Sequence, residues 1–413
     1  MNEMEQRPGE EIPLRMLRAE DTDEKLSAES IFVAFVFFVV LSQFLIYGRT
    51  ELLTQPFRPL IVLFLTLQVV RRGRLRLPVC RTAAVMSVYQ ILIWFILYPK
   101  GGSIRDYLTL VFYFMMLFSA ASFPWNRGEL RLILFATFAA TFMCAAAFFF
   151  SNNMLDFSEH QMYFLGTAVN RNKNAYAFAF GILLGRSYLA YGKGRNRLLL
   201  LLVMAFEGYC LLYSKCRGAF WSLVIAFMTI ALHRTVRMWK RGNPFTALYV
   251  FLNLLAVTIV YFLLRDSLVS RLVDRENLSG RDEGMQHALE LFRMAPTAGK
   301  IFGNGMLYEG AHTEGLGVHF VYLTYLLEAG IIGMVLIILI FVQALLHTRG
   351  EVAQSMLIFA LARTFFEGMD YYIFIPLILS LCLTNYERLT GRSCRDVLGR
   401  SRTGPSGPSP GRY

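Results

Sequence analysis

Long apolar runs separated by short polar stretches make up most of the chain. A helix needs about 20 mainly apolar residues to cross the hydrocarbon core of a bilayer. By this measure we predict twelve spans, at 31–48, 52–70, 82–98, 107–123, 132–150, 174–191, 198–214, 218–232, 245–264, 326–346, 352–369 and 371–385. The span at 352–369 is the weakest, because it contains Arg363 and Glu367. The pattern therefore predicts an all-α polytopic membrane protein with about twelve transmembrane helices.

The polar stretches divide the chain into five parts. An acidic N-terminal tail at 1–30 precedes the first nine helices at 31–264. A single long loop at 265–325 leads to the last three helices at 326–385. Residues 386–413 form a basic tail with a Gly/Ser/Pro-rich end, which predicts disorder. Because long ordered loops usually have a function, we expect the chemistry of the protein at 265–325.

Basic residues predict the orientation of the spans. One set of alternate short loops carries fifteen Lys and Arg residues, and the other set carries seven. Loops rich in Lys and Arg face the cytoplasm. The richer set is 71–81, 124–131, 192–197, 233–242 and 347–350. Both termini are therefore expected in the cytoplasm and the long loop on the outer face.

The composition agrees with a membrane protein. Hydrophobic residues make up 55% of the chain and charged residues 17%, against about 25% charged in soluble domains. The net charge of +12 does not indicate nucleic-acid binding, because the excess lies in short loops between apolar runs. The six cysteines contain no CxxC pair and no metal-ligand spacing with histidine, so we expect no metal and no cofactor.

The long loop contains one helical pattern. In "GMQHALELFRMA", Met285, Ala288, Leu289 and Phe292 fall on one helix face, which predicts a short amphipathic helix on the membrane surface or over a cavity. Pro296 ends this pattern. The glycines that follow predict a flexible return towards the next span, where Gly330 and Gly333 are expected to allow close helix packing.

Three basic side chains are expected on the outer face. Arg217 follows Lys215 in a tight turn between two spans, and Arg281 follows a Ser-Gly turn in the long loop. His319 stands before the tenth span. Each has an ordinary interpretation by itself: an arginine at the headgroups, a solvated loop charge and a structural histidine. Together they fit glycosyl transfer from a lipid pyrophosphate, because arginine binds phosphate oxygens through a fork of donors and imidazole deprotonates hydroxyls.

Acidic residues in the predicted spans are further candidates. Glu207 lies inside the seventh span, where an ionisable side chain is costly and is functional by default. Glu367 and Arg363 lie four residues apart and share a helix face, so they are expected to neutralise each other. The alternative is that Glu367, or Asp370 at the outer end of this span, belongs to the site.

Four stretches follow one another along the chain: "TAVNRNKNAYAFAF", "SKCRGAFWSLVIA", "SGRDEGMQHALELFRMAPTAGKIFGNG" and "HFVYLTYLLEAGIIG". They resemble the motifs of the O-antigen ligase and O-antigen polymerase family of bacterial membrane glycosyltransferases. The chain differs from the family pattern at Lys173, where proline is usual, at Met285, where tryptophan is common, and at Phe320, which replaces asparagine. The resemblance covers roughly residues 165–335.

The resemblance implies a GT-C-like fold and a metal-independent, inverting transferase in the bacterial cytoplasmic membrane. Its donor would be a glycan on a polyprenyl pyrophosphate such as undecaprenyl pyrophosphate, and its acceptor a sugar hydroxyl of a second glycan or of lipid A-core. Arg217 and Arg281 would hold the pyrophosphate, and His319 would activate the acceptor. The remaining substrate-binding candidates are Lys215, Lys173, Asn174 and Glu367.

Several functions fit these observations. A polymerase of a surface polysaccharide is favoured, since nothing in the sequence marks a lipopolysaccharide acceptor, but an O-antigen ligase shares the same motifs. A twelve-span transporter or flippase is the alternative of another class. It is less favoured because residues 31–191 and 198–385 show no internal repeat. A purely structural membrane scaffold has the least support. Membrane lipids are the other expected partners.

Overall fold

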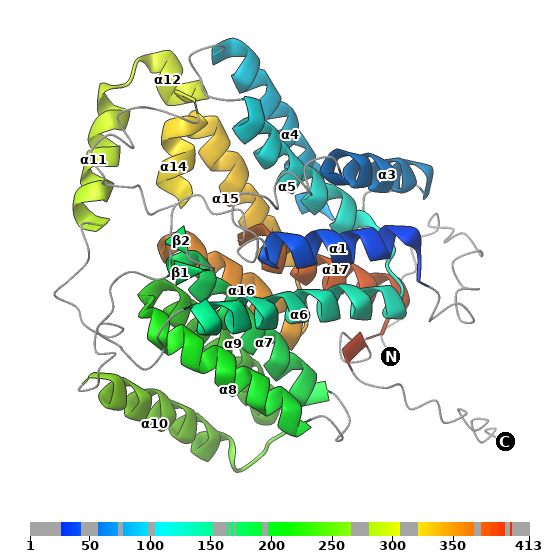
Figure 1. Cartoon of the computed structure of the whole chain (residues 1–413), viewed down its shortest axis with the longest axis vertical. Helices are drawn as coiled ribbons and strands as arrows, with labels where there is room; N and C mark the ends of the chain where they lie inside the picture. The colour runs from blue at the N-terminus through cyan, green and yellow to red at the C-terminus, as the bar shows by residue number, and fades with distance from the viewer. Residues whose placement is uncertain are drawn as a thin grey trace, which may run out of the picture.

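The chain folds into a bundle of α-helices (Figure 1). The computed structural model describes residues 26–42, 57–72, 77–97, 104–151, 163–164, 167–168, 171–191, 197–265, 281–305, 321–366, 373–392 and 397–398. In these ranges the only other regular structure is a two-stranded antiparallel pair, in which β1 (Tyr163–Phe164) lies beside β2 (Thr167–Ala168).

The helices follow the apolar runs of the sequence. In chain order they are α1 (Ala28–Ser42), α3 (Phe57–Arg72), α4 (Pro78–Leu97), α5 (Ile104–Ser122), α6 (Arg127–Ser151), α7 (Arg171–Tyr191), α8 (Arg197–Ser214), α9 (Arg217–Lys240), α10 (Thr246–Arg265), α11 (Arg281–Met294), α12 (Thr297–Phe302), α14 (Val321–Glu328), α15 (Gly330–His347), α16 (Glu351–Phe366) and α17 (Phe374–Thr390).

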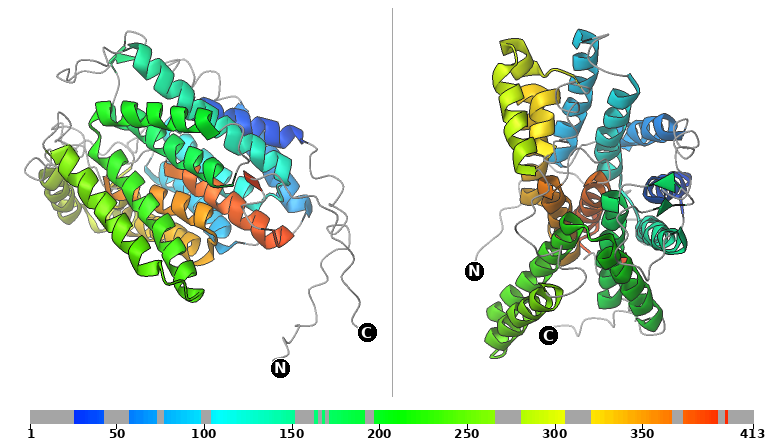
Figure 2. Two further views of the ribbon diagram at one scale, coloured as in Figure 1. Left: turned by 90° about the horizontal axis from the view of Figure 1, so that it is seen from below. Right: turned by 60° about the vertical axis from the view of Figure 1, so that its left-hand side comes forward.

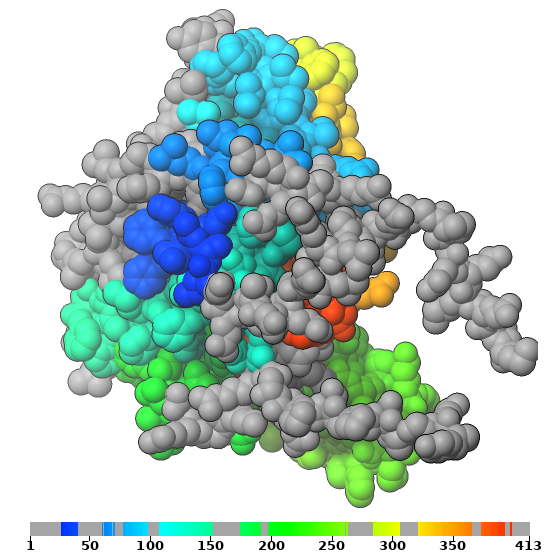
Figure 3. All heavy atoms as spheres, turned by 90° about the vertical axis from the view of Figure 1, so that its right-hand side faces the viewer, coloured from blue at the N-terminus to red at the C-terminus, as the bar shows by residue number. Residues whose placement is uncertain are grey.

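Each predicted span overlaps a helix, but the helices differ in length and polarity. Among the described residues, five are long and apolar enough to cross a membrane: α4, α6, α8, α9 and α15. These five helices indicate a membrane protein, whereas the number of twelve spans stays a prediction. Helices α1, α3 and α6 lie on one flank of the molecule (Figure 3). Ile31, Leu63 and Phe135 on these helices are large apolar residues with exposed side chains.

Helix α17 forms the centre of the bundle. Every residue from Phe374 to Tyr386 is buried, and α5, α6 and α16 pack against it. Side chains point in all directions from a helix, so burial of every residue requires neighbouring segments on all sides. The last predicted span is therefore an internal helix of the protein in the described structure.

Long-range contacts bring several helix ends to one pole of the bundle. The Thr82 hydroxyl donates to Gln343 Oε1 at 2.7 Å, which joins the start of α4 to the end of α15. At the start of α16, Glu351 pairs with Arg234 near the end of α9, with 3.2 Å between Nε and Oε1. We call this end the basic pole. The opposite pole is the end at which α7 and α9 begin and α16 ends.

A capping box begins α6 at the basic pole. The Asn126 N–H donates to Glu129 Oε2 at 2.9 Å, and the Glu129 N–H donates to Asn126 Oδ1 at 2.9 Å. This reciprocal pair satisfies two of the backbone donors that a helix start leaves without intrahelical partners. The sequence "NRGE" thus fixes where α6 begins.

The chain after the last predicted span continues to pack against the bundle. Helix α17 runs to Thr390, five residues past the predicted end of the span at 385. Further on, Val397 and Leu398 are buried, and Arg131 Nε donates to the Val397 carbonyl oxygen at 2.6 Å. These residues belong to the predicted disordered tail, and here the structure holds them against α6. The rest of that tail, like most of the predicted N-terminal tail, lies outside the described residues.

The predicted span at 326–346 is not one helix. Ala329 separates α14 from Gly330, the first residue of α15, and the Tyr322 and Phe341 rings lie 6.5 Å apart. These two residues would be about 28 Å apart in a continuous helix. Helix α14 therefore folds back along α15 as a hairpin, as Figure 1 also shows. The sequence missed the break because the apolar pattern continues across it.

The predicted amphipathic helix of the long loop is confirmed as α11, with a different buried face. Ala288 and Leu291 are buried against Leu327 of α14, whereas Met285 is exposed. Helices α11, α12 and α14 lie together with α4 at one end of the molecule (Figure 2). The apolar face of α11 covers α14, rather than a bare membrane surface.

Candidate functional site

Two glycine-rich stretches meet where α12 ends and α14 turns into α15. The Asn304 N–H donates to the Leu327 carbonyl oxygen at 3.0 Å, and the Gly305 N–H donates to the Glu328 carbonyl oxygen at 3.1 Å. Asn304 Nδ2 also donates to the Leu327 oxygen at 3.2 Å. These bonds satisfy carbonyls that the end of α14 leaves free of intrahelical donors. The glycine return, predicted to be flexible, is held at Asn304 and Gly305 by these bonds.

Glycine is required at this junction for its backbone as well as its size. Gly303 and Gly330 have φ angles of 94° and 66°. A Cβ atom on Gly330 would lie 2.3 Å from the Ile301 carbonyl oxygen. The Tyr89 hydroxyl of α4 donates to the Ala329 carbonyl oxygen at 2.8 Å, which ties the turn to the bundle. The prediction that Gly330 packs closely is confirmed.

The start of α7 places Asn174 in the protein interior. Its side chain is 1% exposed, and neither Nδ2 nor Oδ1 has a hydrogen-bond partner. A buried amide without partners costs free energy, and such positions are often kept for a ligand or an ordered water. Lys173 lies one residue earlier in α7, in the part of the helix described by its backbone only.

An arginine inside α16 contacts the same part of α7. Arg363 is fully buried, and its Cζ atom lies 4.8 Å from the centre of the Tyr176 ring. Phe359, one turn earlier on α16, stacks on the same ring at 4.8 Å between centroids. The ring face attracts the guanidinium, which lowers the cost of burying its charge. The sequence placed Arg363 beside Glu367, which lies outside the described residues, and gave no signal for Tyr176.

Helix α14 starts beside the same segment of α16. The Thr364 and Tyr322 hydroxyls are hydrogen-bonded at 3.1 Å, and the Thr364 hydroxyl also contacts the Leu361 carbonyl oxygen at 2.6 Å. Val321, the first residue of α14, is buried. Because Thr364 follows Arg363 directly, the start of α14 lies next to the segment that carries the buried guanidinium.

A strained turn precedes α9. Lys215 has a φ angle of 51°, which is unusual for a residue with a side chain. The Cys216 N–H donates to Ser214 Oγ at 3.4 Å, and Arg217 is the first residue of α9. The Lys215 and Arg217 side chains are both partly buried. The two cations are therefore held close to the bundle, as the short predicted turn required.

The predicted site residues come together only in part. Arg217 is the first residue of α9, and Asn174 lies in the first turn of α7. These two helices pack against each other and against α16. Arg281 starts α11, where its backbone alone is described. His319, Glu367 and Asp370 lie outside the described residues. A common site for Arg217, Arg281 and His319 is thus still a prediction.

Glu207 forms a separate buried position between three helices. Its side chain is fully buried in α8. A Cβ atom on Gly181 of α7 would lie 2.1 Å from Glu207 Oε1 and 2.5 Å from the Thr141 hydroxyl oxygen of α6. Gly181 therefore makes the room that the Glu207 carboxyl occupies.

Within the described ranges, no three His, Cys, Asp or Glu side chains are grouped closely enough to hold a metal ion. Comparison with known proteins leaves the family open. No model of a protein family matches the chain, and a search of curated proteins finds no match.

Proposed function

We propose that this protein is a membrane glycosyltransferase that extends a surface polysaccharide as a polymerase. It would transfer a glycan from a polyprenyl-pyrophosphate carrier to a sugar hydroxyl of a second lipid-linked glycan. One observation carries the proposal. The stretches that resemble the O-antigen ligase and polymerase family include the starts of α7 and α9 and the α14 hairpin, and all three pack against α16.

The proposed reaction follows from the chemistry of these side chains. The acceptor oxygen attacks the anomeric carbon, the bond from that carbon to the phosphate oxygen breaks, and the configuration inverts. Arg217 and Arg281 bind the pyrophosphate and stabilise the charge that develops on it. His319 takes the proton of the acceptor hydroxyl. The polyprenyl pyrophosphate leaves with the electron pair of the broken bond.

Arg363 and Tyr176 would support the site by holding α7 in place. Their contact fixes α7 against α16, and Asn174 stands two residues before Tyr176 with an amide that has no protein partner. An amide in this position is suited to bind a sugar hydroxyl or a phosphate oxygen. The Lys215 ammonium, held in the turn before Arg217, would add positive charge for the same anionic group.

The charge distribution supports a site that faces away from the cytoplasm. Arg131, Arg234, Arg237, Arg349 and Arg388 all lie at the basic pole, far along the helices from Arg217. Positively charged helix ends face the cytoplasm in most membrane proteins. The opposite pole would then face the outer leaflet, where lipid-linked glycans are joined in the proposed reaction.

Arg217 provides the decisive test. The purified protein in nanodiscs is given a lipid-linked oligosaccharide, and glycan extension is followed by gel or mass spectrometry. We expect Arg217→Ala to lower the rate of glycan extension at least about 100-fold. Loss of one hydrogen-bond donor to the charge that develops in a transition state typically has an effect of this size. Arg217→Lys should also be impaired, because lysine lacks the two-pronged fork. The matched control is Arg241→Ala, which removes an exposed arginine at the other end of α9.

The same assay separates the competing functions. Product that appears only with lipid A-core as acceptor would replace the polymerase by a ligase. Full extension by an Arg217→Ala protein with unchanged thermal unfolding would remove the proposed role of the arginine. Donor movement across the bilayer without any new glycosidic bond would instead identify a flippase.

A further inference from the structure

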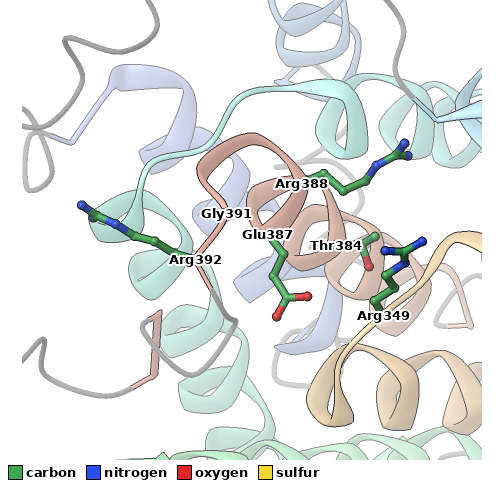
Figure 4. Close-up of a pocket in the computed structure, with 6 residues that line it drawn as sticks. All are labelled: Arg349, Thr384, Glu387, Arg388, Gly391 and Arg392. Carbon is green, nitrogen blue, oxygen red and sulfur yellow. The ribbon is translucent and has the colours of Figure 1, made fainter. Parts of the chain in front are cut away.

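A pocket opens at the basic pole, on the far side of the bundle from the proposed glycan site. It lies between the α15–α16 connection and the end of α17, with a volume of about 330 Å³ (Figure 4). Ligand-binding clefts typically have volumes of roughly 300–1,000 Å³. Its lining residues are Arg349, Thr384, Glu387, Arg388, Gly391 and Arg392.

Two glycine turns shape this pocket. Gly350 has a φ angle of 87°, and a Cβ atom there would lie 3.2 Å from Glu387 Oε1. Gly391 has a φ angle of 66° and closes α17 by donating its N–H to the Glu387 carbonyl oxygen at 3.0 Å. A left-handed glycine is a common way to end a helix. The two turns bring the start of α16 close to the end of α17 and leave the space between them open.

The lining of the pocket is strongly basic. Three of its lining residues are arginines, and Glu387 is the one acidic residue among them. Arg349 and Arg388 extend to the same side of the pocket, Arg392 extends to the opposite side, and Thr384 lies beside Arg349 (Figure 4). The nearby acid on α16, Glu351, is already bound to Arg234 at 3.2 Å and therefore does not neutralise the pocket.

Helix stability alone does not account for this arrangement. Basic residues near a helix C-terminus interact favourably with the helix dipole, which explains Arg388 in the last turn of α17 and Arg392 just after its end. Arg349 belongs to a different element, the connection from α15 to α16. Its presence in the same pocket creates a site with cations from two elements, which suits an anion with several oxygen acceptors.

The pocket lies where a lipid-facing surface ends. Helix α15 has 18 residues and is about 27 Å long, close to the thickness of the hydrocarbon core. Val342, Leu345 and Leu346 expose 42%, 40% and 74% of their surface in its last two turns. Arg349 follows α15 by two residues. A phosphate in the pocket would therefore be at headgroup depth, with apolar surface beside it for an acyl chain.

We propose that this pocket binds the phosphate of an anionic phospholipid headgroup in the leaflet at the basic pole. Arg349 of the α15–α16 connection and Arg388 of α17 bind the phosphate oxygens, and Thr384 lies beside Arg349. The exposed apolar face of α15 accommodates the lipid tail. The site is independent of the glycan transfer proposed above, because it lies at the other end of the bundle.

Lipid binding to purified protein tests this site. The wild-type protein in detergent is titrated with phosphatidylglycerol or phosphatidylcholine, and retained lipid is measured by native mass spectrometry. We expect clear retention of phosphatidylglycerol over phosphatidylcholine. The double variant Arg349→Ala/Arg388→Ala should bind phosphatidylglycerol about 30-fold more weakly, since each basic residue at an anionic surface adds to the affinity.

The matched control removes the same charge from the same pole. Lys240→Ala/Arg241→Ala loses two exposed cations at the end of α9, outside the pocket. Its phosphatidylglycerol binding should stay within about twofold of wild type, as expected for charges that do not contact the lipid. Equal losses in both double variants would overturn the proposal in favour of nonspecific attraction.

Two further arms identify the occupant. Arg349→Lys/Arg388→Lys keeps the charge, so its folding should be preserved while its affinity falls between wild type and the alanine variant. Glycerol phosphate and inorganic phosphate are added as soluble competitors at millimolar concentration. Weak competition supports a lipid, whereas displacement of phosphatidylglycerol by either one identifies the pocket as a site for soluble phosphate and overturns the proposal.

Discussion

At the residue scale, the turn at Gly330 decides how the chain runs between α14 and α15. Its φ angle of 66° lies in the left-handed region, which costs other residues about 1–2 kcal/mol. The close approach of the Ile301 carbonyl oxygen excludes a side chain as well. Gly303 is constrained in the same way by the Glu328 carbonyl oxygen, 2.1 Å from the position of its missing Cβ. The junction of α12, α14 and α15 therefore requires glycine at both positions, because neither leaves room for a Cβ atom.

Gly330→Ala should destabilise the protein by about 3 kcal/mol, because a left-handed alanine is combined with overpacking against backbone atoms. The measurement is the free energy of unfolding in a mixed-micelle denaturation series. Gly242→Ala is the control for the backbone alone. It has a φ angle of 63° and no atom within 4 Å of its Cβ position, so its expected loss is about 1 kcal/mol. Equal losses in both variants would show that the contact with Ile301 is unimportant.

At the element scale, each apolar run that was predicted as a span overlaps a helix, because the local sequence determines both helix length and hydropathy. The same runs could not show the break at 329–330. That break depends on bonds from Asn304 and Gly305 to α14, which join residues more than twenty positions apart. The placement of Arg217 at the start of α9 followed from the short turn before it. The stacking of Arg363 on Tyr176 did not, since it arises from the packing of two distant helices.

The packing of α6, α7 and α8 makes a second prediction. Gly181→Ala should destabilise the protein by about 2 kcal/mol, since its methyl group would overlap the buried Glu207 carboxyl. Glu207→Ala removes that carboxyl, so the double variant should be at least about 1 kcal/mol more stable than the two separate losses predict. Denaturation of the four proteins provides the double-mutant cycle. A coupling of zero would show that the two side chains do not share the space.

The control for this cycle lies on the same helix as Glu207. A Cβ atom on Gly208 would meet only Ile182 Cδ1, at 4.0 Å. Gly208→Ala is therefore expected to be neutral or to stabilise the protein by up to about 1 kcal/mol, the usual preference of a helix for alanine. A loss as large as that of Gly181→Ala would mean that α8 tolerates no added methyl group, whatever its contact.

At the scale of the whole molecule, the two poles differ in both charge and architecture. The basic pole has a capping box, paired arginines and the α17 pocket, and its helix ends are joined by direct hydrogen bonds. The opposite end carries the α11, α12 and α14 layer and the starts of α7 and α9 (Figure 1). This asymmetry suits a protein that anchors itself to one leaflet and exchanges substrates at the other. Both proposals depend on it, since each assigns a different kind of phosphate to a different pole.

Thiol labelling in intact cells tests this orientation. The described native cysteines are buried, so a variant with Cys394 replaced gives a low background. Met294→Cys places a thiol at a position that is 74% exposed at the end of α11, and Arg241→Cys places one at the exposed end of α9. We expect a membrane-impermeant maleimide to label position 294 in intact cells and position 241 only after permeabilisation, as the positive-inside rule requires. The reverse pattern would put the arginine pocket in the outer leaflet and the start of α9 at the cytoplasm, where the proposed extension of a surface polysaccharide could not take place.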